Sequence, residues 1–548
     1  MSKRFFIFDS DALKNFHKRI FFSIIIFISF YLIVIFRIAN VMVFEINTKQ
    51  AILIEEEAVR GKIYDRNGKL LATNINNFSL SVREPFKIKN KLVLSNKLSK
   101  ILSLNKDEIL YNLNSNKNFV YIKRNISPKE HQKIIELGEI HLQTEKNIKR
   151  VYPFHNIGSH TIGYVNIDNK GQSGAERGFD DELSKGKNIY LTIDVNLQNA
   201  VRQELVRIIN KFSAVSGISI IMNLKNGEIL SLISYPDFDP NKKRTFNQKN
   251  LLNRALQANY EMGSTFKPLT VAMGIDKDLI TPNMSFDVSK PIKGTIHDYH
   301  PHDGNYNIKE IVVNSSNIGI AKIAKIIGKN NQIEFFKKIG FYDKINFHLK
   351  EAAKPLGNKN NWGLIETMTI GYGHGFAITP LHLISAYASI SNEGIKVIPK
   401  ILLHQNDTDY SEQIIKKQTS DYILKLLRAV VLETKFTGKQ VKIEGYQIGG
   451  KTGTADLNKN GKYLENENLT SFIAVFPISK PQYVVLSIIE NPNKTKEIKN
   501  LTGATVSAPL VKNIILRMIE ILNIPRIPND EILNADIRVD YQRKYATY

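Results

Sequence analysis

Residues 261–268 read EMGSTFKP and contain the pattern Ser-x-x-Lys, at Ser264 and Lys267. Gly263 can take a conformation strained for other residues, and Pro268 falls in the first turn of the apolar segment that follows, where proline is tolerated. The stretch therefore predicts that Ser264 lies at a helix N-terminus, where backbone N–H groups and the helix dipole stabilise negative charge on a reacting oxygen. Lys267 would project from the same face one turn later. A Ser–Lys pair is a known arrangement for nucleophilic catalysis.

The Ser-x-x-Lys pattern does not identify a nucleophile by itself, because it occurs three times in the chain. The other copies are Ser103 with Lys106 and Ser184 with Lys187. Both lie in the N-terminal region, whereas the Ser264 copy is followed at domain-scale distances by two further motifs. Those two motifs separate it from the other copies.

The second motif is SSN at 315–317, which precedes a segment with helical spacing. Taken alone, it reads as a helix N-cap. The third motif is KTG at 451–453, between glycines and an acidic, Asn-rich loop. A lysine on a glycine-flanked strand can be approached closely by a ligand backbone and can bind a carboxylate. Ser-x-x-Lys, Ser-x-Asn and Lys-Thr-Gly in this order form the signature of penicillin-binding proteins and serine β-lactamases.

The chain resembles the class B penicillin-binding proteins over nearly its whole length, and most closely the family's cell-division D,D-transpeptidases. The similar segments cover the motifs of the family's N-terminal pedestal, the nucleophile, the helix and loop before the third motif, and the third motif itself; they are residues 60–72, 150–183, 253–268, 371–394 and 445–456. Met262 departs from the family, which usually has proline there. This departure bears on the loop geometry before Ser264 and not on the chemistry that the resemblance implies.

The strand and helix patterns predict an α+β fold. Residues 216–234 read as two β runs joined by a tight turn. Another strand pair is predicted at 471–477 and 482–490, and helical spacing occurs at 196–212 and 506–522. Strands at both ends of a region with helices between them suggest an antiparallel sheet covered by helices.

The resemblance implies a serine β-lactamase-like transpeptidase domain that follows an elongated β-rich pedestal and a single N-terminal transmembrane helix. The expected divisions are residues 1–19 as a cytoplasmic tail, 20–44 as the transmembrane anchor, 45–187 as a pedestal of the dimerisation type, 188–525 as the transpeptidase domain and 526–548 as a C-terminal tail.

The N-terminal segment predicts an uncleaved membrane anchor. Residues 20–36 carry no charge, and the apolar character resumes after Arg37 up to Phe44. This is long enough for a bilayer core, which needs roughly 17–25 residues. Basic residues precede the span and acidic residues follow it, so the bulk of the chain should lie outside the inner (cytoplasmic) membrane, in the periplasm or its equivalent. A cleaved signal peptide would need a shorter apolar core and a small-residue cleavage site.

The amino-acid composition excludes several classes of function. The 548 residues include no cysteine, which excludes disulfides, thiolate catalysis and cysteine-based metal sites. The formal net charge of +23 would suit a nucleic acid, but no RNA-binding, zinc-finger or helix-turn-helix pattern is present. A basic surface facing an anionic membrane or envelope polymer fits better, and we expect no nucleic-acid partner.

The resemblance implies a two-step acyl transfer between peptidoglycan stem peptides. Ser264 would attack the penultimate D-Ala carbonyl and release the terminal D-Ala, and an amine from a neighbouring strand would then form the cross-link. Lys267 would accept the serine proton, β-lactams would acylate the same serine, and no metal or other cofactor is implied. The other implied roles are proton relay and substrate-amide contact by Ser315 and Asn317, electrostatic support by Lys451, substrate-carboxylate binding by Thr452, Gly453 and Thr454, and an oxyanion hole made by the backbone N–H groups of Ser264 and Thr454.

The resemblance also implies the partners of the protein. These are nascent glycan strands and their stem peptides, a multi-spanning glycan polymerase of the FtsW type, other division proteins and the inner membrane. A glycosyltransferase domain of its own would need roughly 150 residues or more with acidic catalytic motifs. Residues 45–190 do not supply such motifs, so polymerisation should come from a partner.

Alternatives to a septal transpeptidase stay open. An elongation-specific transpeptidase of the same class is the main one, although the pedestal motifs and the segment at 371–383 favour division. A carboxypeptidase or β-lactamase is less favoured, because those chains usually lack a pedestal and no deacylating Glu-x-x-x-Asn segment is seen. A non-catalytic envelope scaffold would not need three intact motifs, and a β-lactam sensor would need a cytoplasmic signalling domain.

The segment HDYHPHDG at 297–304 raises the question of a metal site. Histidine and aspartate are common metal ligands, but such a cluster is more often the polar rim of a loop near a cleft. We therefore expect no metal there. The residues concerned are His297, Asp298, His300, His302 and Asp303.

Overall fold

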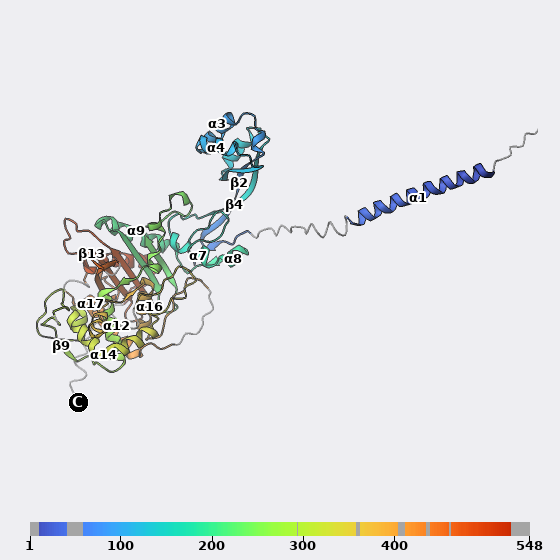
Figure 1. The fold of residues 1–548 in the computed structure, drawn as a ribbon. Coiled ribbons are helices and arrows are strands. Elements are labelled where there is room, and N and C mark those ends of the chain that lie inside the picture. Colours follow the sequence, from blue (N-terminus) through green and yellow to red (C-terminus); the bar gives the residue numbers. More distant parts are fainter. Residues whose placement is uncertain are drawn as a thin grey trace, which may run out of the picture. The chain divides into compact units, whose positions relative to one another are not determined.

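The computed structural model (Figure 1) describes residues 10–40, 59–292, 294–357, 362–403, 412–434, 439–459 and 462–527. The chain divides into two compact units, residues 1–59 and residues 60–548.

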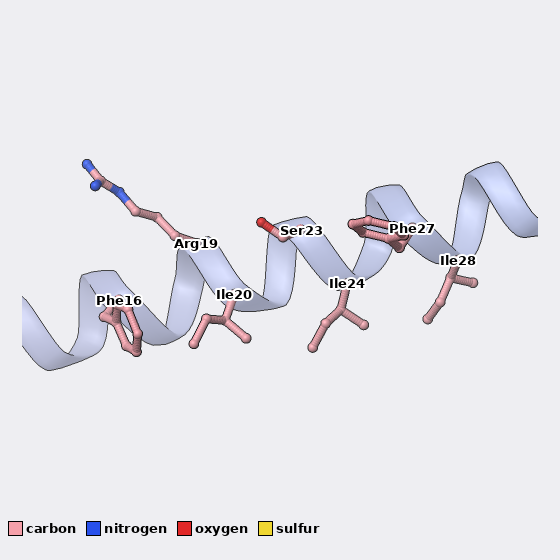
Figure 2. Close-up of a pocket in the computed structure, with 7 residues that line it drawn as sticks. All are labelled: Phe16, Arg19, Ile20, Ser23, Ile24, Phe27 and Ile28. Carbon is pink, nitrogen blue, oxygen red and sulfur yellow. The ribbon is translucent and has the colours of Figure 1, made fainter.

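The N-terminal unit contains one long helix, α1 (Ser10–Asn40). Its segment from Lys14 to Asn40 is long and apolar enough to cross a membrane. Apolar side chains point outward all round it: Phe16, Ile20, Ile24 and Ile28 follow one side, and Phe27 projects elsewhere (Figure 2). A helix that is hydrophobic on every side and not covered by protein is typical of a membrane span. The helix begins ten residues before the expected span, and residues 41–44 of that span lie outside the described part.

The second unit opens with the predicted hairpin. Strand β1 (Ile63–Tyr64) pairs antiparallel with β2 (Leu70–Arg83). Asn67 and Gly68 form the turn, where Gly68 has φ +78°, a conformation that glycine adopts without steric cost. The Asp65 carboxylate fixes the turn because it accepts the backbone N–H groups of Asn67 and Lys69 at 2.8 and 2.7 Å. The hairpin predicted at 60–72 is therefore confirmed.

A sheet and short helices follow the hairpin, and residues of two of its strands and of the first three helices enclose a small core of their own. Strand β2 pairs antiparallel with both β3 (Phe119–Ile126) and β4 (Leu142–Val151), and β1 pairs parallel with β5 (Ile189–Tyr190). The helices of this region are α3 (Lys91–Leu102), α4 (Lys106–Leu113), α5 (Pro128–Ile135), α6 (Ser159–Ile162), α7 (Gly174–Gly178) and α8 (Asp180–Ser184).

A buried ion cluster joins the hairpin, β4 and α7. The Glu176 carboxylate accepts Arg60 Nε at 2.8 Å and Arg150 Nε at 2.7 Å. All three residues are at most 5% exposed. Buried charges of this kind are tolerated only when each is paired and hydrogen-bonded. The cluster therefore makes the placement of three distant segments depend on one carboxylate.

Replacing Glu176 by alanine should lower the free energy of unfolding by about 3–5 kcal/mol, because it leaves the buried Arg150 guanidinium without its carboxylate and leaves Arg60 only its ion pair with Asp180 at 2.8 Å. Urea unfolding of the purified protein measures this change. The control is Glu182→Ala in neighbouring α8, where the side chain is exposed; we expect a change within about 0.5 kcal/mol. A loss below about 1 kcal/mol for Glu176→Ala would contradict the importance of the cluster.

The larger sheet of the unit has five antiparallel strands in the order β12-β13-β14-β6-β7. The strand bounds are β6 (Ser216–Asn223), β7 (Ile229–Tyr235), β12 (Gly449–Lys459), β13 (Lys462–Phe476) and β14 (Tyr483–Glu490). Both predicted strand pairs are thus present. The predicted α+β architecture, an antiparallel sheet covered by helices, is confirmed.

Strands β6, β7, β13 and β14 send alternate side chains to two separate cores. On β13, Phe472 packs against α9 (Val195–Phe212) and α18 (Ala508–Ile521), whereas Ile473 packs in the larger core on the opposite face. This alternation follows from the two-residue period of a β-strand. The helices of the larger core are α12 (Lys267–Asp276), α13 (Ile308–Val313), α14 (Asn317–Lys338), α16 (Pro380–Ser391) and α17 (Lys417–Glu433). Figure 1 shows α12, α14, α16 and α17 gathered together.

Smaller elements complete the unit. They are the helices α10 (Gln248–Leu251), α11 (Arg254–Gln257) and α15 (Leu364–Ile370), and the short strands β8 (Tyr260–Glu261), β9 (Ser285–Asp287), β10 (Asn305–Asn307) and β11 (Ala377–Ile378). Strand β8 pairs with β11, and β9 with β10.

Strand β13 differs from its prediction, because it begins at residue 462 and not near 471. Residues 458 and 459 of β12 pair with 463 and 462 of β13, beyond an irregularity in the ladder near Asp456. The segment expected as an acidic, Asn-rich loop is therefore the tip of a β-hairpin. Its strands are held by backbone pairing, which the sequence does not signal by apolar alternation.

Candidate active site

Ser264 lies in a tight turn at the start of α12. Residues Gly263–Phe266 form a 3-10 helix, and α12 begins directly after it at Lys267, with Pro268 in the first turn. Ser264 is partly exposed, whereas Lys267 is fully buried. The serine thus occupies a 3-10 turn before the α-helix and not the first α-helical residue, as a tight turn is common at a helix N-terminus. The expected order of serine, lysine and proline around the helix start is retained.

Close backbone contacts fix the turn that carries Ser264. Gly263 has φ +54°, and a Cβ atom at this position would meet the Thr454 carbonyl oxygen at 2.8 Å. Its N–H donates to the Gly373 carbonyl at 3.1 Å. Only glycine combines the positive φ with so close an approach. The turn of Ser264 is therefore packed closely between strand β12 and the loop before β11.

Met262, which departs from the family pattern, does not disturb the turn. Its side chain is fully buried in the larger core, and its backbone is at φ −85° and ψ −1°. This φ lies near the range that proline imposes. Its carbonyl accepts the Thr265 hydroxyl at 2.8 Å. The methionine therefore fills core volume while its backbone stays close to a proline-like conformation.

The SSN motif lies at the junction between α13 and α14. Ser315 has φ +59°, a left-handed conformation that is uncommon outside glycine and typical of functional or tightly packed positions. Ser316 is the N-cap of α14, since its hydroxyl accepts the Gly319 N–H at 2.9 Å. The local N-cap reading of the motif is thus right for Ser316, whereas Ser315 is turned away from the helix.

The three motifs meet at the hydroxyl of Ser315. Lys267 Nζ donates to Ser315 Oγ at 3.1 Å and also to the Ser315 backbone carbonyl. Lys451 Nζ donates to the same Oγ at 3.0 Å. Lys267 and Lys451, which lie 48 and 136 positions from Ser315 in the sequence, therefore bind the same hydroxyl oxygen. Among the described residues, the Ser264 hydroxyl makes no hydrogen bond, and Lys267 reaches Ser315 instead.

Burial of two amines side by side determines their protonation. The pKa of Lys267 lies well below the ordinary value for lysine. Desolvation lowers it most, and the neighbouring Lys451 ammonium lowers it further, whereas the Asp298 carboxylate raises it. Desolvation lowers the pKa of Lys451 to about 7. A buried charge is costly, so a lysine in such a site releases its proton readily. A neutral lysine is available near neutral pH.

Asp298 holds the SSN motif in place. Its carboxylate accepts the Ser316 hydroxyl at 2.7 Å, the Ile318 N–H at 3.1 Å and the Asn317 N–H. A carboxylate at the first turn of a helix satisfies free N–H groups and interacts favourably with the helix dipole. No such role could be predicted for Asp298, because it lies 19 residues from Asn317 and no local pattern connects them.

The other residues of the 297–304 segment take different partners. The His297 carbonyl accepts Asn317 Nδ2 at 2.8 Å, and His302 Nδ1 lies 3.2 Å from the Tyr306 hydroxyl. Within the described part of the chain, no group of three or more histidine, cysteine or acidic residues could hold a metal ion. Asn317 thus faces His297 and does not join the lysine–serine contacts.

The KTG motif lies on the free edge of the larger sheet. Among the described residues, strand β12 pairs with β13 on one side only, and it is the last strand in the order. Lys451 and Thr452 are buried, and Thr454 is exposed, with its hydroxyl accepting the Gly503 N–H at 3.1 Å. A Cβ atom on Gly453 would meet Ser471 Oγ at 2.3 Å and the Met262 carbonyl at 2.9 Å. An unpaired strand edge beside Ser264 offers backbone groups to an extended peptide.

Two family models match the chain. Residues 217–516 match the penicillin-binding protein transpeptidase domain, and residues 55–217 match the penicillin-binding protein dimerisation domain.

Curated relatives cover most of the chain. It is 31% identical over 490 residues to the probable peptidoglycan D,D-transpeptidase FtsI of Caulobacter vibrioides, which covers 86% of this chain and 82% of that protein. It is 30% identical to stage V sporulation protein D of Bacillus subtilis, over 84% of this chain and 77% of that protein. The identity to the probable peptidoglycan D,D-transpeptidase PenA of Neisseria meningitidis is 28%, over 85% of both chains.

A solved structure shares the fold. The crystal structure of a peptidoglycan synthetase from Bifidobacterium adolescentis matches with a TM-score of 0.68 at 19% sequence identity. The match covers 86% of this chain and 97% of that chain. At this identity, the likeness concerns the fold alone.

Proposed function

The chain belongs to the class B penicillin-binding proteins, which are serine-type peptidoglycan D,D-transpeptidases, and we propose that it cross-links stem peptides of the septal wall during cell division. One observation carries the proposed site: the amines of Lys267 and Lys451 both bind Ser315 Oγ, and Lys267 begins the helix that directly follows the turn of Ser264. The similarity to peptidoglycan D,D-transpeptidases named FtsI supports the division role. The similarity to a sporulation protein keeps a different septum-related or elongation role as the second candidate.

Acylation would begin with the proton of Ser264. Neutral Lys267 accepts this proton as Ser264 Oγ forms a bond to the penultimate D-Ala carbonyl carbon. The carbon–nitrogen bond to the terminal D-Ala then breaks, and the proton passes to the leaving amine through Lys267 and Ser315. A general base contributes about 10²–10⁴-fold to such a step. In the second step, the amine of a neighbouring stem peptide attacks the ester, loses a proton by the same route and releases Ser264.

The backbone and the sheet edge would hold the substrate. The N–H groups of Ser264 and Thr454 would stabilise the oxyanion, and each such donor is worth about 2.7–4 kcal/mol in comparable enzymes. The donor peptide would lie along β12, with its carboxylate beside Thr452, Gly453 and Thr454 and with an amide against Asn317. Lys451 adds positive charge when protonated. A β-lactam would follow the acylation path and leave Ser264 covalently modified.

The apolar helix α1 fits a single-pass membrane anchor. We propose that its basic N-terminal flank stays in the cytoplasm and that residues 60–548 work outside the membrane, where stem peptides are found. Glycan strands would come from a multi-spanning polymerase of the FtsW type, since this chain resembles the transpeptidase partner of such enzymes. Other division proteins of the inner membrane would bring the pair to the septum.

Cross-linking by the purified full-length protein tests the activity. The protein is incubated in detergent with nascent, uncross-linked peptidoglycan strands, and muramidase digests are analysed by mass spectrometry. The expected product is a dimeric muropeptide with loss of one D-Ala for each cross-link, and it should disappear when the protein is treated with penicillin beforehand. Release of D-Ala without any dimer would identify a carboxypeptidase and overturn the proposal.

Depletion of the protein in its own cells tests the division role. Filaments with unfinished septa are expected, because septal cross-linking stops while elongation continues. Rounded cells of normal length would instead assign the protein to elongation. The rescue strain, which expresses the wild-type chain from a second locus, should restore septation.

Asp298→Asn should slow acylation by about 10- to 100-fold, because a hydrogen bond to a charged group contributes about 1.5–3 kcal/mol. The substitution keeps one oxygen acceptor but removes the negative charge that binds the free N–H groups at the N-terminus of α14 and the Ser316 hydroxyl. The rate of labelling by a fluorescent penicillin measures the effect. Asp303→Asn, in the same loop but exposed, is the matched control, and equal rates for both variants would remove Asp298 from this role.

A further inference from the structure

A second cluster of polar side chains lies beside the nucleophile turn and takes no part in the chemistry above. Glu261 is in β8, three residues before Ser264. Its carboxylate lies 3.1 Å from His374 Nδ1 and accepts the Tyr463 hydroxyl at 3.1 and 3.2 Å. The rings of His374 and Tyr463 stack with centroids 4.9 Å apart and an interplanar angle of 16°. Three segments far apart in the sequence therefore meet at one carboxylate.

Each of the three segments is coupled to the active site by backbone contacts. Glu261 continues into the turn of Ser264, and Gly373, next to His374, accepts the Gly263 N–H at 3.1 Å. Gly373 has φ +83°, and a Cβ atom there would meet the Gly263 carbonyl oxygen at 2.3 Å. The loop that carries His374 can therefore not move without affecting the nucleophile turn.

Tyr463 belongs to the unexpected extension of β13. It pairs with residue 458 at the tip of the β12–β13 hairpin, past the ladder irregularity near Asp456. The same hairpin carries the KTG motif on β12. Backbone pairing across two strands alone is a weak constraint, because an isolated hairpin is marginally stable in water. Attachment of its tip to β8 would limit how far the edge of β12 swings from Ser264.

We propose that Glu261, His374 and Tyr463 form a protonation-dependent clasp that positions the β12–β13 hairpin against the nucleophile turn. The three are positioning residues, since none reaches the reacting atoms through a contact described here. The inference rests on the proposed role of β12 in substrate binding. It assigns a function to a histidine and a hairpin extension that the three motifs leave unexplained.

The charge of His374 determines the strength of the clasp. The groups that face it are Glu261 on β8, Asp456 on β12, Tyr463 on β13 and Tyr372 in its own loop. The hydrogen bond to Glu261 raises the pKa of His374, burial lowers it, and the charges of Glu261 and Asp456 raise it, with a net increase. The ion pair is thus complete below the ordinary pKa of histidine and is lost as the pH rises through the raised value. With 42% of its side chain exposed, His374 can exchange protons without unfolding.

The test compares wild type with His374→Phe, which keeps a ring for stacking on Tyr463 but removes the ion pair. The full-length protein in detergent is labelled with a fluorescent penicillin across the pH range. We expect the variant to be about three- to fivefold slower near pH 6, as suits a partly exposed ion pair, and nearly equal to wild type near pH 9. Protonation of Lys267 and Lys451 affects both proteins alike and cancels in the ratio of rates.

The matched control is His155→Phe, because His155 Nδ1 lies 3.1 Å from the Asp239 carboxylate in an equally short pair outside this cluster. It should not change the ratio. Glu261→Gln, which keeps the size of the side chain but loses its charge, should reproduce the pH dependence of His374→Phe. If the two variants show the same pH dependence, misfolding of one of them cannot explain the effect.

Hydrogen exchange tests whether the clasp holds the hairpin, independently of acylation. Amide exchange in residues 455–470, corrected for the intrinsic pH dependence, should be faster in His374→Phe than in wild type near pH 6, and exchange in residues 216–235 should be unchanged. A rate ratio that does not vary with pH, or equal exchange in 455–470, overturns the proposal. If the assignment of Ser264 fails instead, Ser264→Ala will still be labelled while the exchange difference persists, so the two failures are distinguishable.

Discussion

Ser264→Ala is expected to abolish covalent labelling by a fluorescent penicillin and to reduce cross-linking by about 10⁴-fold or more, as removal of a nucleophilic serine does in other serine enzymes. Ser264 is the partly exposed hydroxyl in the turn before α12, next to the buried lysines. Without this oxygen no acyl-enzyme can form, whatever the remaining geometry contributes. Gel fluorescence of the membrane fraction and dimeric muropeptide formation measure the two effects.

The chain supplies its own control for this prediction. Ser184 is followed by Lys187 in the same Ser-x-x-Lys spacing, but it is exposed on α8, and its hydroxyl donates to the Asp181 carbonyl at 3.1 Å. Ser184→Ala should label like wild type. Equal labelling of Ser264→Ala and wild type would show that another residue is acylated and would remove the proposed nucleophile.

Lys267→Arg should lower the rate of acylation by about 10²–10⁴-fold, the contribution expected of a general base. Arginine keeps the positive charge and much of the length, but its guanidinium is not deprotonated in proteins. Burial lowers the pKa of the Lys267 amine, but the same burial would not deprotonate arginine. Arginine at this position would therefore have no free electron pair with which to accept the serine proton. Rates of penicillin labelling under single-turnover conditions measure the loss. A variant within about threefold of wild type would exclude Lys267 as the base.

The protonation of the two lysines predicts the pH dependence of the wild-type rate. Burial lowers the pKa of Lys267, so its active, neutral form grows as the pH rises through that lowered value. Lys451 acts as a cation and has a pKa of about 7, so its charge is present below this value and is lost above it. A bell-shaped profile of the acylation rate is the expected result. In Lys267→Arg, the increase of the acylation rate on the acid side of this profile should be absent.

Much of the fold could be predicted because it depends on local patterns. The hairpin at 60–72 follows from Asn67-Gly68 between apolar runs, and the helices α9 and α18 follow from apolar spacing. The strands β6, β7 and β14 carry runs of β-branched residues. The tip of the β12–β13 hairpin escaped prediction, because Asn and Glu residues dominate it and backbone pairing alone makes it a strand.

The site was predicted as a set of residues but not as a geometry. The order of the three motifs selects Ser264 and Lys267 from three equal Ser-x-x-Lys copies. The structure adds that both lysines meet at Ser315 Oγ and that Lys267 donates there and not to Ser264. Neither contact follows from spacing, since the partners are 48 and 136 residues apart and their approach depends on how α12, α14 and β12 pack.

An apolar N-terminal span, an α+β domain and three motifs whose side chains suit acyl transfer can all be read from the amino-acid sequence. These features are encoded by composition, short-range periodicity and motif order, which act over a few residues. The contacts of Asp298 at the start of α14, and those of His374 and Tyr463 with the Glu261 carboxylate, are seen only in the folded chain. Such contacts arise from the packing of segments distant in the chain, so no local pattern announces them.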